Sequence, residues 1–485
     1  MDFRNKKITV MGLGLHGGGE GLTRFLAERG AQVTVTDLKS EAELKPTLDK
    51  LSDLTNIKYH LGGHSWSDFK SADLVFINQA VSKKSLWVKK IAKAQIPISS
   101  ETNLFFQMCR GQTIGVTGTN GKSTVATLIF EILKTKYQSV SILESDNQPA
   151  DDNHAKVYLG GNIGGSLLKH VDQISQNDLV VLELSSFQLQ DLAQIKKSPH
   201  IAVILNVTPD HLDQHSDFSE YLEAKKNIVK FQKESDFSIL NYDYKNVRRI
   251  AKSSLAQNLF FSRQTELTKG SFLDEEMICV MFRGKKYQII PTSKIKIPGV
   301  HNIENILASV LVGILYQVPV TNISRALTNF KGLPHRIELV ADLAGIKFYN
   351  DSKATTPEST ISALNSFQKP VILICGGKEK NLDFSKLAKT MINKVRYLLL
   401  IGETAAKIEK EIQKISQKIK QNKNQKLILP KTTLVNNLEK AVSMAKMKAK
   451  SGDVVLFSPA TSSYDQFSGF EERGEKFKQF VLGAK

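Results

Sequence analysis

Short runs of apolar and β-branched residues recur along the chain, and each is followed by a polar or glycine-rich turn and a stretch with helical periodicity. Residues 7–11, 112–116 and 371–375 are such runs, and residues 20–29 and 122–134 are such helical stretches. A short continuous apolar run predicts a buried strand, and apolar positions three and four apart predict a helix. Their regular alternation predicts an α/β protein with mostly parallel sheets and crossover helices.

The alternation falls into three blocks, and 485 residues correspond to about three domains of roughly 150 residues each. We predict a Rossmann-like domain over residues 1–105 and a central domain over 106–332, with a mostly parallel sheet of the phosphate-loop ATPase type. A second Rossmann-like domain is predicted over 333–485. Sheets of this kind bind ligands at the carboxyl ends of their strands, so polar residues at those ends are the first candidates for chemistry.

The composition narrows the class of protein. With 41% hydrophobic and 24% charged residues, the chain can bury substantial cores, which excludes disordered and collagen-like proteins. Its three cysteines lie far apart, so neither a zinc site nor a disulfide framework is indicated. The sequence has no apolar run of about 18 residues and no signal-peptide pattern, so we expect a cytoplasmic protein without a membrane partner.

The formal net charge of +18 would fit a nucleic-acid-binding protein. Most of the excess is lysine, which is spread along the chain and is densest near residues 407–426. No arginine-rich arm, aromatic RNA motif or zinc finger accompanies it. We therefore favour a lysine-rich surface over a nucleic-acid groove and expect no nucleic-acid partner, although some of the charge would suit anionic small molecules.

The sharpest chemical signal is the segment Gly115-Val-Thr-Gly118-Thr119-Asn120-Gly121-Lys122-Ser123-Thr124. It follows a predicted strand and precedes a predicted helix, which is the setting of a phosphate loop. Glycines let successive backbone N–H groups turn toward phosphate oxygens, and the helix start adds its dipole. Lys122 can then reach the β- and γ-phosphates, and the Ser123 hydroxyl can bind Mg²⁺.

Two further predicted strands end in groups that bind metal ions. Glu183 lies at the end of the run over residues 179–184, and His211 follows the run over 201–207. Either residue alone fits a polar cap on a strand, but beside a phosphate loop both are candidate Mg²⁺ ligands. Nucleotide and metal binding do not by themselves separate kinases, motors, GTPases and ligases.

Motifs along nearly the whole chain give a resemblance to a known family. In order they are Gly12-Leu-Gly-Leu, Gly118-Thr-Asn-Gly-Lys-Ser-Thr, Gly160-Gly-Asn162-Ile-Gly, Glu183-Leu-Ser-Ser-Phe-Gln-Leu, Asn206-Val-Thr-Pro-Asp-His211-Leu-Asp, Tyr221-Leu-Glu-Ala-Lys225, His301-Asn302, Leu333-Pro-His-Arg336, Asn350-Asp351-Ser-Lys353-Ala-Thr355 and Ser458-Pro-Ala. Their order and spacing resemble the ATP-dependent Mur ligases of peptidoglycan synthesis. No single motif decides this, but their joint order does.

The resemblance implies an amide ligase. ATP would phosphorylate the carboxylate of UDP-N-acetylmuramoyl-L-alanine, and the amine of glutamate would attack the acyl phosphate to give an amide, ADP and phosphate. A carboxylate becomes a good electrophile once an oxygen is turned into a phosphate leaving group, and the developing charge needs cations. The implied cofactors are ATP and two Mg²⁺ ions, the implied partners are the two small-molecule substrates, and we expect a monomer.

The resemblance also assigns metal ligands. Ser123 and Glu183 would bind one Mg²⁺, and His211 and Lys225 would serve the second. Lys225 corresponds to a lysine that the family carbamylates with CO₂, whereas the sequence alone suggests a solvated helix position. The next residue is also lysine, so the register depends on Tyr221 four residues upstream. The implied catalytic residues are Lys122, Glu183, His211 and Lys225.

Other matching positions imply substrate contacts. Residues 118–124, Asn302, Asn305, Arg336, Asp351 and Lys353 would contact ATP. An arginine suits phosphate recognition, and an aspartate suits ribose hydroxyls. The segment over residues 458–477 resembles the members that add D-glutamate, and the Asp-Asn-Pro-Arg motif of the diamino-acid-adding members is absent. Thr355, Lys380, Ser463 and Phe470 would contact glutamate.

The first block departs most from the family pattern. Gly12, Gly14 and Gly17 fit G-x-G-x-x-G, and Asp37 follows 20 residues later, so a dinucleotide site is an alternative. In the family this domain holds the UDP group, and the implied UDP-sugar contacts are Leu15, His16, Asp37 and Asn162. His16 replaces a usual small hydroxyl residue, and residues 78–81 differ from the common Ser-Pro-Gly loop.

Two other functions stay open on the sequence alone. One is a different Mur-like ligase, such as a folylpolyglutamate-type enzyme or one that adds another amino acid. The other is a non-enzymatic, nucleic-acid-associated ATP-binding protein, which the net charge would fit. The sequence also leaves open whether the glutamate is the D or the L enantiomer.

Overall fold

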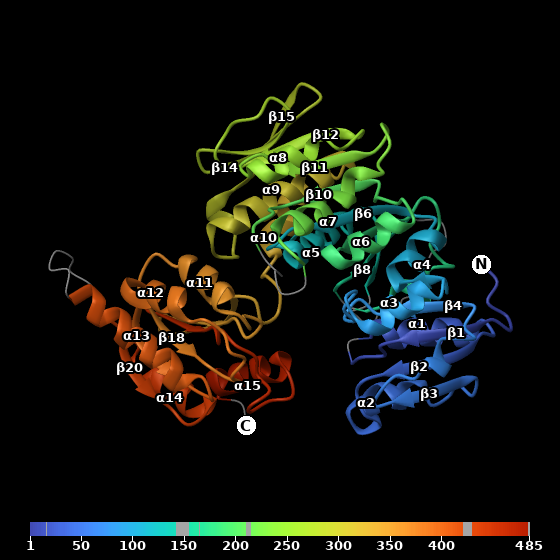
Figure 1. The fold of residues 1–485 in the computed structure, drawn as a ribbon. Coiled ribbons are helices and arrows are strands. Elements are labelled where there is room, and N and C mark those ends of the chain that lie inside the picture. The colour runs from blue at the N-terminus through green and yellow to red at the C-terminus, as the bar shows by residue number, and fades with distance from the viewer. Residues whose placement is uncertain (16, 142–154, 164, 210–214, 421–428, 484–485) are drawn as a thin grey trace. The chain divides into compact units, whose positions relative to one another are not determined.

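The computed structural model describes residues 1–15, 17–141, 155–163, 165–209, 215–420 and 429–483. Its strands form three sheets, and helices connect most of the successive strands (Figure 1). The chain divides into two compact units, Met1–Ser293 with Ile303–Leu327, and Lys294–Asn302 with Thr328–Lys485. The first two sheets belong to the first unit and the third sheet to the second.

The first sheet has the order β3-β2-β1-β4-β5, and all its strands are parallel. Its elements are β1 (Lys7–Met11), α1 (Gly18–Glu28), β2 (Gln32–Asp37), α2 (Glu41–Leu48), β3 (Ile57–Leu61), β4 (Leu74–Ile77), α3 (Leu86–Lys93), β5 (Ile98–Ser99) and the following α4 (Glu101–Met108). β1 is central, so the turn after it and Asp37 at the end of β2 share one edge of the sheet.

The second sheet has the order β15-β14-β13-β12-β11-β10-β6-β9-β8-β7, and only the β13-β14-β15 pairings are antiparallel. Its elements are β6 (Gln112–Thr117), α5 (Lys122–Leu133), β7 (Gln138–Ser141), β8 (Lys156–Gly161), η3 (Leu167–His170), β9 (Leu179–Glu183), α6 (Ser186–Gln194), β10 (Ile201–Ile204), α7 (Phe218–Lys230), β11 (Phe237–Asn241), α8 (Lys245–Ala251), β12 (Gln257–Ser262), β13 (Gly270–Asp274), β14 (Met277–Phe282), β15 (Lys285–Pro291), α9 (Val300–Leu315) and α10 (Val320–Asn329). β6 is an interior strand between β10 and β9, and its Ile114 and Val116 are fully buried.

The third sheet has the order β16-β17-β21-β18-β19-β20, and only the β16-β17 pair is antiparallel. Its elements are β16 (Glu338–Leu343), β17 (Ile346–Asn350), α11 (Pro357–Asn365), β18 (Val371–Cys375), α12 (Ser385–Lys394), β19 (Val395–Leu400), α13 (Ala405–Lys420), β20 (Lys431–Leu434), α14 (Leu438–Lys448), β21 (Val454–Phe457) and α15 (Phe470–Leu482). The last strand of the chain thus enters the middle of the sheet, which brings the loop after β21 beside the loops after β17 and β18.

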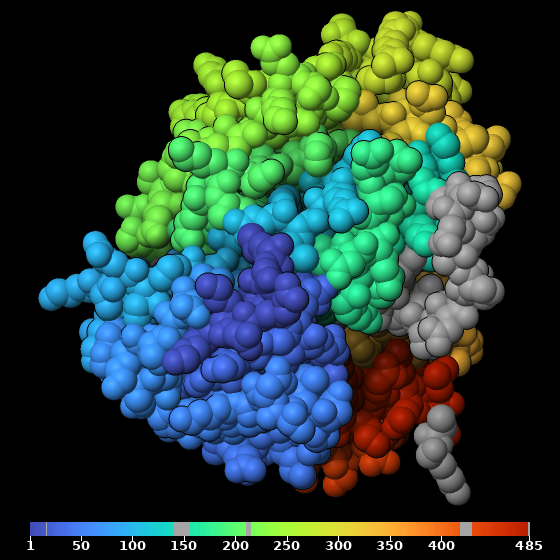
Figure 2. Space-filling view, turned by 90° about the vertical axis from the view of Figure 1, so that its right-hand side faces the viewer, coloured from blue at the N-terminus to red at the C-terminus, as the bar shows by residue number. Residues whose placement is uncertain are grey.

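The first and second sheets are joined within one packed body. Apolar residues from both, including Phe25, Leu104 and Leu182, share one buried cluster, and their surfaces meet in Figure 2. Lys83 Nζ lies 2.5 Å from Asp191 Oδ1 on α6 and links the two parts further. The predicted boundary at residue 105 falls within α4, the one at 332 falls between α10 and β16, and both boundaries stay predictions.

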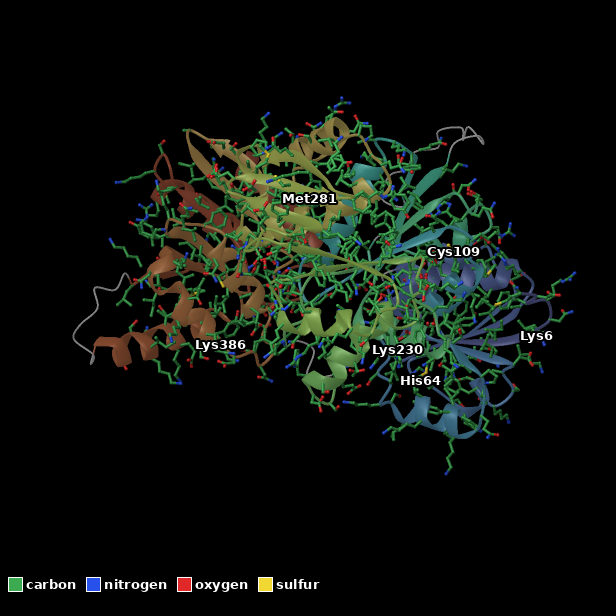
Figure 3. The ribbon with its side chains drawn as sticks, turned by 90° about the horizontal axis from the view of Figure 1, so that it is seen from above. Lys6, His64, Cys109, Lys230, Met281 and Lys386 are labelled. Carbon is green, nitrogen blue, oxygen red and sulfur yellow. The ribbon has the colours of Figure 1, made fainter. Side chains whose placement is uncertain are left out.

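The sequence predicted lysines dispersed over the surface, and exposed lysines occur in all three parts of the chain. Lys6, Lys230 and Lys386 are exposed residues from the parts of the chain that form the three different sheets, and Lys6 and Lys230 lie apart within the first unit in Figure 3. No helix in the described part of the chain is both long enough and apolar enough to cross a membrane.

Candidate active site

The predicted phosphate loop lies between an interior strand and a helix. β6 ends at Thr117, residues 118–121 form the turn, and α5 begins at Lys122, so the predicted strand–loop–helix setting is confirmed. Gly121 has a φ of 88°, and a Cβ there would lie 2.4 Å from Asn305 Oδ1. A left-handed conformation and so close a neighbour require glycine at this turn.

The segment that follows β10, the strand next to β6, holds the loop in place. Thr119 N donates to Asn206 O at 2.9 Å, and Asn120 N donates to Asn206 Oδ1 at 2.9 Å. Asn206 Nδ2 donates in return to Asn120 O at 3.2 Å. The Thr119 hydroxyl donates to Thr208 O at 3.1 Å. These bonds fix the turn before any ligand binds, so little ordering is left to occur on binding.

The start of α5 is suited to anions. The first backbone N–H groups of a helix have no acceptor within the helix and carry partial positive charge. Lys122 adds a cation here, and its Nζ donates to Gly118 O at 3.0 Å and to Thr119 O at 2.9 Å. Ser123 is buried, and Thr124 is half-buried in the same turn. The arrangement concentrates positive charge at one end of the loop.

Glu183 has the features of a cation ligand. It ends β9, which pairs with β6, and it is 3% exposed. Its Oε1 accepts a hydrogen bond from Asn162 Nδ2 at 3.3 Å, whereas Oε2 is buried without a hydrogen-bond partner among the described residues. An unpartnered buried carboxylate oxygen is costly, and carboxylate and hydroxyl oxygens are ligands that Mg²⁺ accepts. The donor set of Ser123 and Glu183 therefore fits a magnesium ion.

The described residues contain no group of three or more His, Cys, Asp or Glu side chains that could hold a metal ion. A cation at Glu183 therefore needs hydroxyl, phosphate or water oxygens, or residues outside the described part of the chain. His211, the predicted partner ligand, lies outside the described residues.

The structure separates two adjacent lysines. Lys225 on α7 is 2% exposed, and its Nζ donates to Thr117 Oγ1 and to Gly118 O, both at 3.0 Å. Its Nζ also lies 5.2 Å from the centroid of the Tyr221 ring. Lys226 is more exposed and pairs with Glu223 at 3.3 Å. Of the two, Lys225 is the one that reaches the loop.

A cavity of about 870 Å³ opens beside this site in the first unit. The predicted UDP-sugar contacts Leu15, Asp37 and Asn162 all line it, and His16 lies outside the described residues. Because Asn162 also contacts Glu183, the cavity extends from the turn after β1 to the carboxyl end of β9. A long ligand bound there would reach the phosphate-loop region.

Asp37 organises the turn after β1. Its Oδ2 accepts from Leu13 N at 2.8 Å and from Gly14 N at 3.1 Å, and its Oδ1 accepts from Lys39 N at 2.9 Å. These three bonds engage both carboxylate oxygens with backbone. The side chain therefore shapes the cavity wall, which is a role that spacing from the glycine motif does not reveal.

The two predicted asparagine contacts lie at the start of α9. Asn305 is 4% exposed, and its Oδ1 faces Gly121 of the phosphate loop. Asn302 is 8% exposed, and its Nδ2 donates to Pro298 O at 2.6 Å.

In the second unit, Asp351 is buried at the end of β17. It accepts from Ser458 Oγ at 2.7 Å and from Ile337 N at 3.2 Å. Burial raises the pKa of Asp351 to about 7, and these two bonds together with the nearby Arg336 charge lower it only in part. Lys353 follows on the surface, where its Nζ lies 5.1 Å from the Phe470 ring centroid.

The predicted glutamate contacts occupy neighbouring loops of the same unit. Phe470 begins α15, and Ser463 is buried in the loop after β21. Lys380 is exposed, with its Nζ 5.9 Å from the ring centroid of Tyr464, the residue after Ser463. Thr355 is half-buried, and its N–H donates to Lys353 O at 2.9 Å.

Arg473 is a site component to which the sequence assigned no role. It is 1% exposed on α15 and donates to Ser352 Oγ at 3.1 Å, to Ser352 O at 2.8 Å and to Thr461 O at 3.1 Å. Burial lowers its pKa to about 10. It thus ties the loop with Asp351 to the loop with Ser463, and a lone arginine in a helical pattern carries no signal of such burial.

Family models match three successive parts of the chain. They are "Mur ligase MurD-like, N-terminal domain" over residues 6–100, "Mur ligase middle domain" over 116–313 and "Mur ligase, glutamate ligase domain" over 335–461. The chain belongs to the Mur ligase family. The predicted family and fold class are confirmed.

Similar Mur ligases cover the whole chain. The UDP-N-acetylmuramoylalanine–D-glutamate ligase of Acetivibrio thermocellus is 38% identical over 479 residues, which are 99% of this chain and 97% of that relative. The enzyme of the same name from Koribacter versatilis is 37% identical over 481 residues, 99% of this chain and 98% of that relative. The crystal structure of the UDP-N-acetylmuramate–alanine ligase MurC from Thermotoga maritima aligns with a TM-score of 0.60 at 17% identity, covering 99% of this chain and 100% of that one, which shows the shared fold.

Proposed function

We propose that this Mur ligase joins D-glutamate to UDP-N-acetylmuramoyl-L-alanine with hydrolysis of ATP to ADP and phosphate, as the names of its full-length relatives indicate. The observation that carries the proposal is the cavity that ends at Asn162, which is bonded to Glu183 beside the phosphate loop. A UDP-sugar lying in this cavity would present its terminal carboxylate to ATP. We further propose a cytoplasmic monomer.

Three segments would divide the work. Residues 1–105 would hold the acceptor's nucleotide, residues 106–332 would hold ATP and metal, and residues 333–485 would bring glutamate. The fold supports this division because each segment carries one sheet, and candidate residues lie at strand ends, where α/β sheets bind ligands.

In this reaction the protein would position the substrates and neutralise the negative charge that they carry. The start of α5 and Lys122 would bind the phosphates of ATP, and Asn162 would orient the acceptor carboxylate. That carboxylate attacks the γ-phosphorus and releases ADP. The glutamate amine then attacks the carbonyl carbon, phosphate leaves and the amine proton passes to solvent. Dispersed anionic charge in such steps is stabilised by fixed cations and N–H groups.

Ser123 and Glu183 would hold one Mg²⁺, and His211 and Lys225 would serve a second. When bound, the ions supply positive charge to the phosphate oxygens. Oε2 of Glu183 has no hydrogen-bond partner among the residues that the structure describes, which supports the first assignment.

Lys225 would act as a carbamate. Its neutral amine would attack CO₂, form an N–C bond and lose a proton, which converts a cation into an anionic oxygen ligand. The support is its position: the side chain is 2% exposed and lies at the base of the phosphate loop. A buried lysine loses its charge more readily than a solvated one, and only the neutral amine reacts with CO₂.

The start of α9 and the second unit would complete the substrate contacts. Asn302, Asn305, Arg336, Asp351 and Lys353 would contact ATP, and Thr355, Lys380, Ser463 and the backbone at Phe470 would hold glutamate. Lys353 Nζ lies 5.1 Å from the centroid of the Phe470 ring, and this adjacency supports a glutamate position next to the phosphates.

A phosphate-release assay with substrate omission tests the proposal. Release should need ATP, Mg²⁺, UDP-N-acetylmuramoyl-L-alanine and D-glutamate together, and L-glutamate should support little turnover. Full release without the acceptor would contradict the ligase reaction, and preference for another amino acid would indicate a different Mur-like ligase. Salt-sensitive nucleic-acid binding without acceptor-dependent turnover would favour an ATP-binding protein of another kind.

Adjacent lysines provide a matched test of the carbamate. Lys225→Ala should lower turnover by about 100-fold or more, with partial rescue by acetate, because the loss removes a group that stabilises the transition state. Lys226→Ala should change turnover less than about twofold. Equal effects of the two substitutions, or normal activity of Lys225→Ala, would contradict the assignment.

A further inference from the structure

A half-buried carboxyl group lines the acceptor cavity and is not used by the mechanism above. Glu101 is the first residue of α4, and it lines the cavity together with Gly18, the first residue of α1. A Cβ on Gly18 would lie 2.9 Å from Glu101 Oε2, so the carboxyl group lies against the first turn of α1. That turn begins after Gly17 and has no side-chain cap within the described part of the chain. The start of a helix attracts anions and hydrogen-bond acceptors, and the Glu101 carboxyl group occupies that position.

The surroundings of Glu101 favour its neutral form. Burial raises the pKa of Glu101 to about 7, and a hydrogen bond with Ser166 lowers it only in part. Among the described residues no ion pair joins Glu101 to a cation. A carboxylate held without a counter-charge in a partly enclosed site binds a proton more tightly than it does in water.

Several charged groups on the elements around α4 form ion pairs with residues other than Glu101. On α1, Glu20 pairs with Lys50 at 3.6 Å, and Arg24 pairs with Glu28 and Asp53. On α6, Asp191 pairs with Lys83 at 2.5 Å. On η3, Lys169 and His170 are the charged or titratable residues, and the His170 ring packs 6.1 Å from the ring of Tyr158.

Four other titratable groups line the same cavity: Asp37, Lys39, His64 and Asp191, whose ion pair with Lys83 is given above. Asp37 accepts three backbone hydrogen bonds, as described above. His64 bonds to Thr36 Oγ1 at 2.7 Å, and burial lowers the pKa of His64. Lys39 is exposed at the cavity's edge. Burial shifts the pKa of two of these groups, downward for His64 and upward for Asp191.

An anionic ligand changes the balance at Glu101. The acceptor of the proposed function carries a diphosphate, and the cavity places the start of α1 within its reach. A diphosphate and an ionised carboxyl group at the same helix start would repel each other strongly in a partly desolvated site. A protonated carboxyl group would instead donate a hydrogen bond to a phosphate oxygen.

We propose that Glu101 takes up one proton from solvent when the acceptor binds and then donates a hydrogen bond to the acceptor's diphosphate. This inference rests on the proposed function, because the diphosphate comes from the UDP-sugar. Acceptor affinity should therefore fall as the pH rises above 7, by up to tenfold per pH unit, because each binding event must first protonate the carboxyl group.

Calorimetric titration of the full chain with UDP-N-acetylmuramoyl-L-alanine tests the inference. Close to one proton should be taken up from the buffer at pH 8. The apparent binding enthalpies measured in phosphate and in Tris should therefore differ by nearly the full difference between the ionisation heats of the two buffers. Glu101→Gln keeps a hydrogen-bond donor and cannot ionise, so its proton uptake should vanish and its affinity at pH 8 should equal or exceed that of the wild type. Glu41→Gln, an exposed site on α2, should retain the wild-type uptake.

The outcomes separate the two proposals. Binding without proton uptake in the wild type, or full uptake retained in Glu101→Gln, would overturn the role of Glu101. Proton uptake that disappears in His64→Gln but persists in Glu101→Gln would assign the proton to His64. This result would also overturn the role of Glu101. Fluorescence of Trp87, which lines the cavity, checks that each variant is folded there. Absence of acceptor binding at every pH would instead overturn the proposed function.

Discussion

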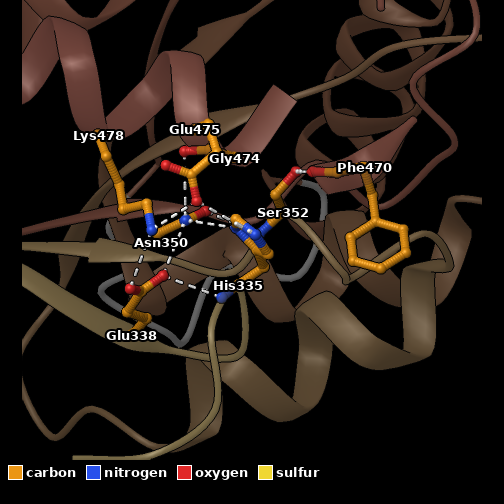
Figure 4. Close-up of polar contacts among 8 residues, drawn as sticks. All are labelled: His335, Glu338, Asn350, Ser352, Phe470, Gly474, Glu475 and Lys478. Atoms are coloured by element: carbon orange, nitrogen blue, oxygen red, sulfur yellow. Dashed lines mark hydrogen bonds and ion pairs between the residues drawn. The ribbon is translucent and has the colours of Figure 1, made fainter. Parts of the chain in front are cut away.

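Replacing Gly474 with alanine would disturb the second unit at a point that the structure defines closely. Gly474 lies in α15, and a Cβ there would be 2.1 Å from His335 Nδ1 and 2.8 Å from His335 Cε1. The His335 ring cannot move away freely, because Nδ1 lies 3.0 Å from Asn350 Nδ2 and the ring packs edge-on to Phe470 (Figure 4). Its backbone N–H also donates to Glu338 Oε2 at 2.9 Å. The added methyl group must therefore displace a buried network.

The expected cost follows from three contributions. Overpacking a buried site costs about 1–3 kcal/mol. Loss of the hydrogen bond between His335 and Asn350 adds about 1 kcal/mol, and the better helix propensity of alanine returns about 1 kcal/mol. The net destabilisation is about 2 kcal/mol, which corresponds to a roughly 30-fold rise in local opening.

Hydrogen–deuterium exchange of the α15 peptide measures this opening directly. Exchange in Gly474→Ala should be roughly 30-fold faster than in the wild type, whereas tryptophan fluorescence should be unchanged, because both tryptophans, Trp66 and Trp87, lie in the first unit. The KM for ATP should also rise, since Lys353 N donates to His335 O at 3.1 Å.

A matched control lies in the same segment. At Gly469 a Cβ would meet the exposed end of Glu471 at 3.1 Å, and that side chain can move aside. Gly469→Ala should therefore change exchange by less than about threefold. Equal exchange in Gly474→Ala and the wild type would refute the reasoning, because it would mean that the His335 network yields without cost.

Three other substitutions test the site. Gly121→Ala should lower ATP turnover by about 100-fold, because a Cβ would meet Asn305 Oδ1 at 2.4 Å and distort the phosphate loop; wild-type phosphate release would contradict this. Glu183→Gln should raise the Mg²⁺ concentration for half-maximal turnover by about tenfold in a Mg²⁺ titration, and an unchanged requirement would exclude Glu183 as a ligand. Asp351 has its pKa raised to about 7, against roughly 3.9 when unfolded, so the folded state holds the proton more tightly and loses stability as the pH rises from about 4 to about 7. The melting temperature of the wild type relative to that of Asp351→Asn should therefore fall as the pH rises through that window and level off above it. A rise would contradict the predicted direction of the pH dependence.

The strands were the most predictable elements, because a buried parallel strand is a local apolar run. Residues 7–11 and 371–375 match β1 and β18 residue for residue. The helix predicted over 20–29 instead begins at Gly18, because the glycine cluster is part of it. At Gly19 a Cβ would lie 2.2 Å from Leu13 O, so glycine permits α1 to approach the turn after β1. That close contact belongs to tertiary packing, which periodicity does not report.

The candidate site also has features that the sequence predicted and features that it did not. The phosphate loop was predictable because its residues are contiguous and its setting is local. The contact between Asn162 and Glu183, which are 21 residues apart, depends on the pairing of β8 with β9. The burial of Arg473 depends on acceptors as many as 121 residues away. The local sequence around these residues does not show which partners they contact.

The sequence by itself determined the α/β class, the order of the three blocks, the phosphate loop and the family, because each is written in contiguous residues or in the order of motifs. Tertiary structure decided which of two adjacent lysines is buried at the loop, that Asp37 holds the turn after β1, and that Glu101 faces the acceptor cavity. These facts depend on which elements pack together. Burial and hydrogen-bond partners are set by that packing, and local sequence patterns constrain it only weakly.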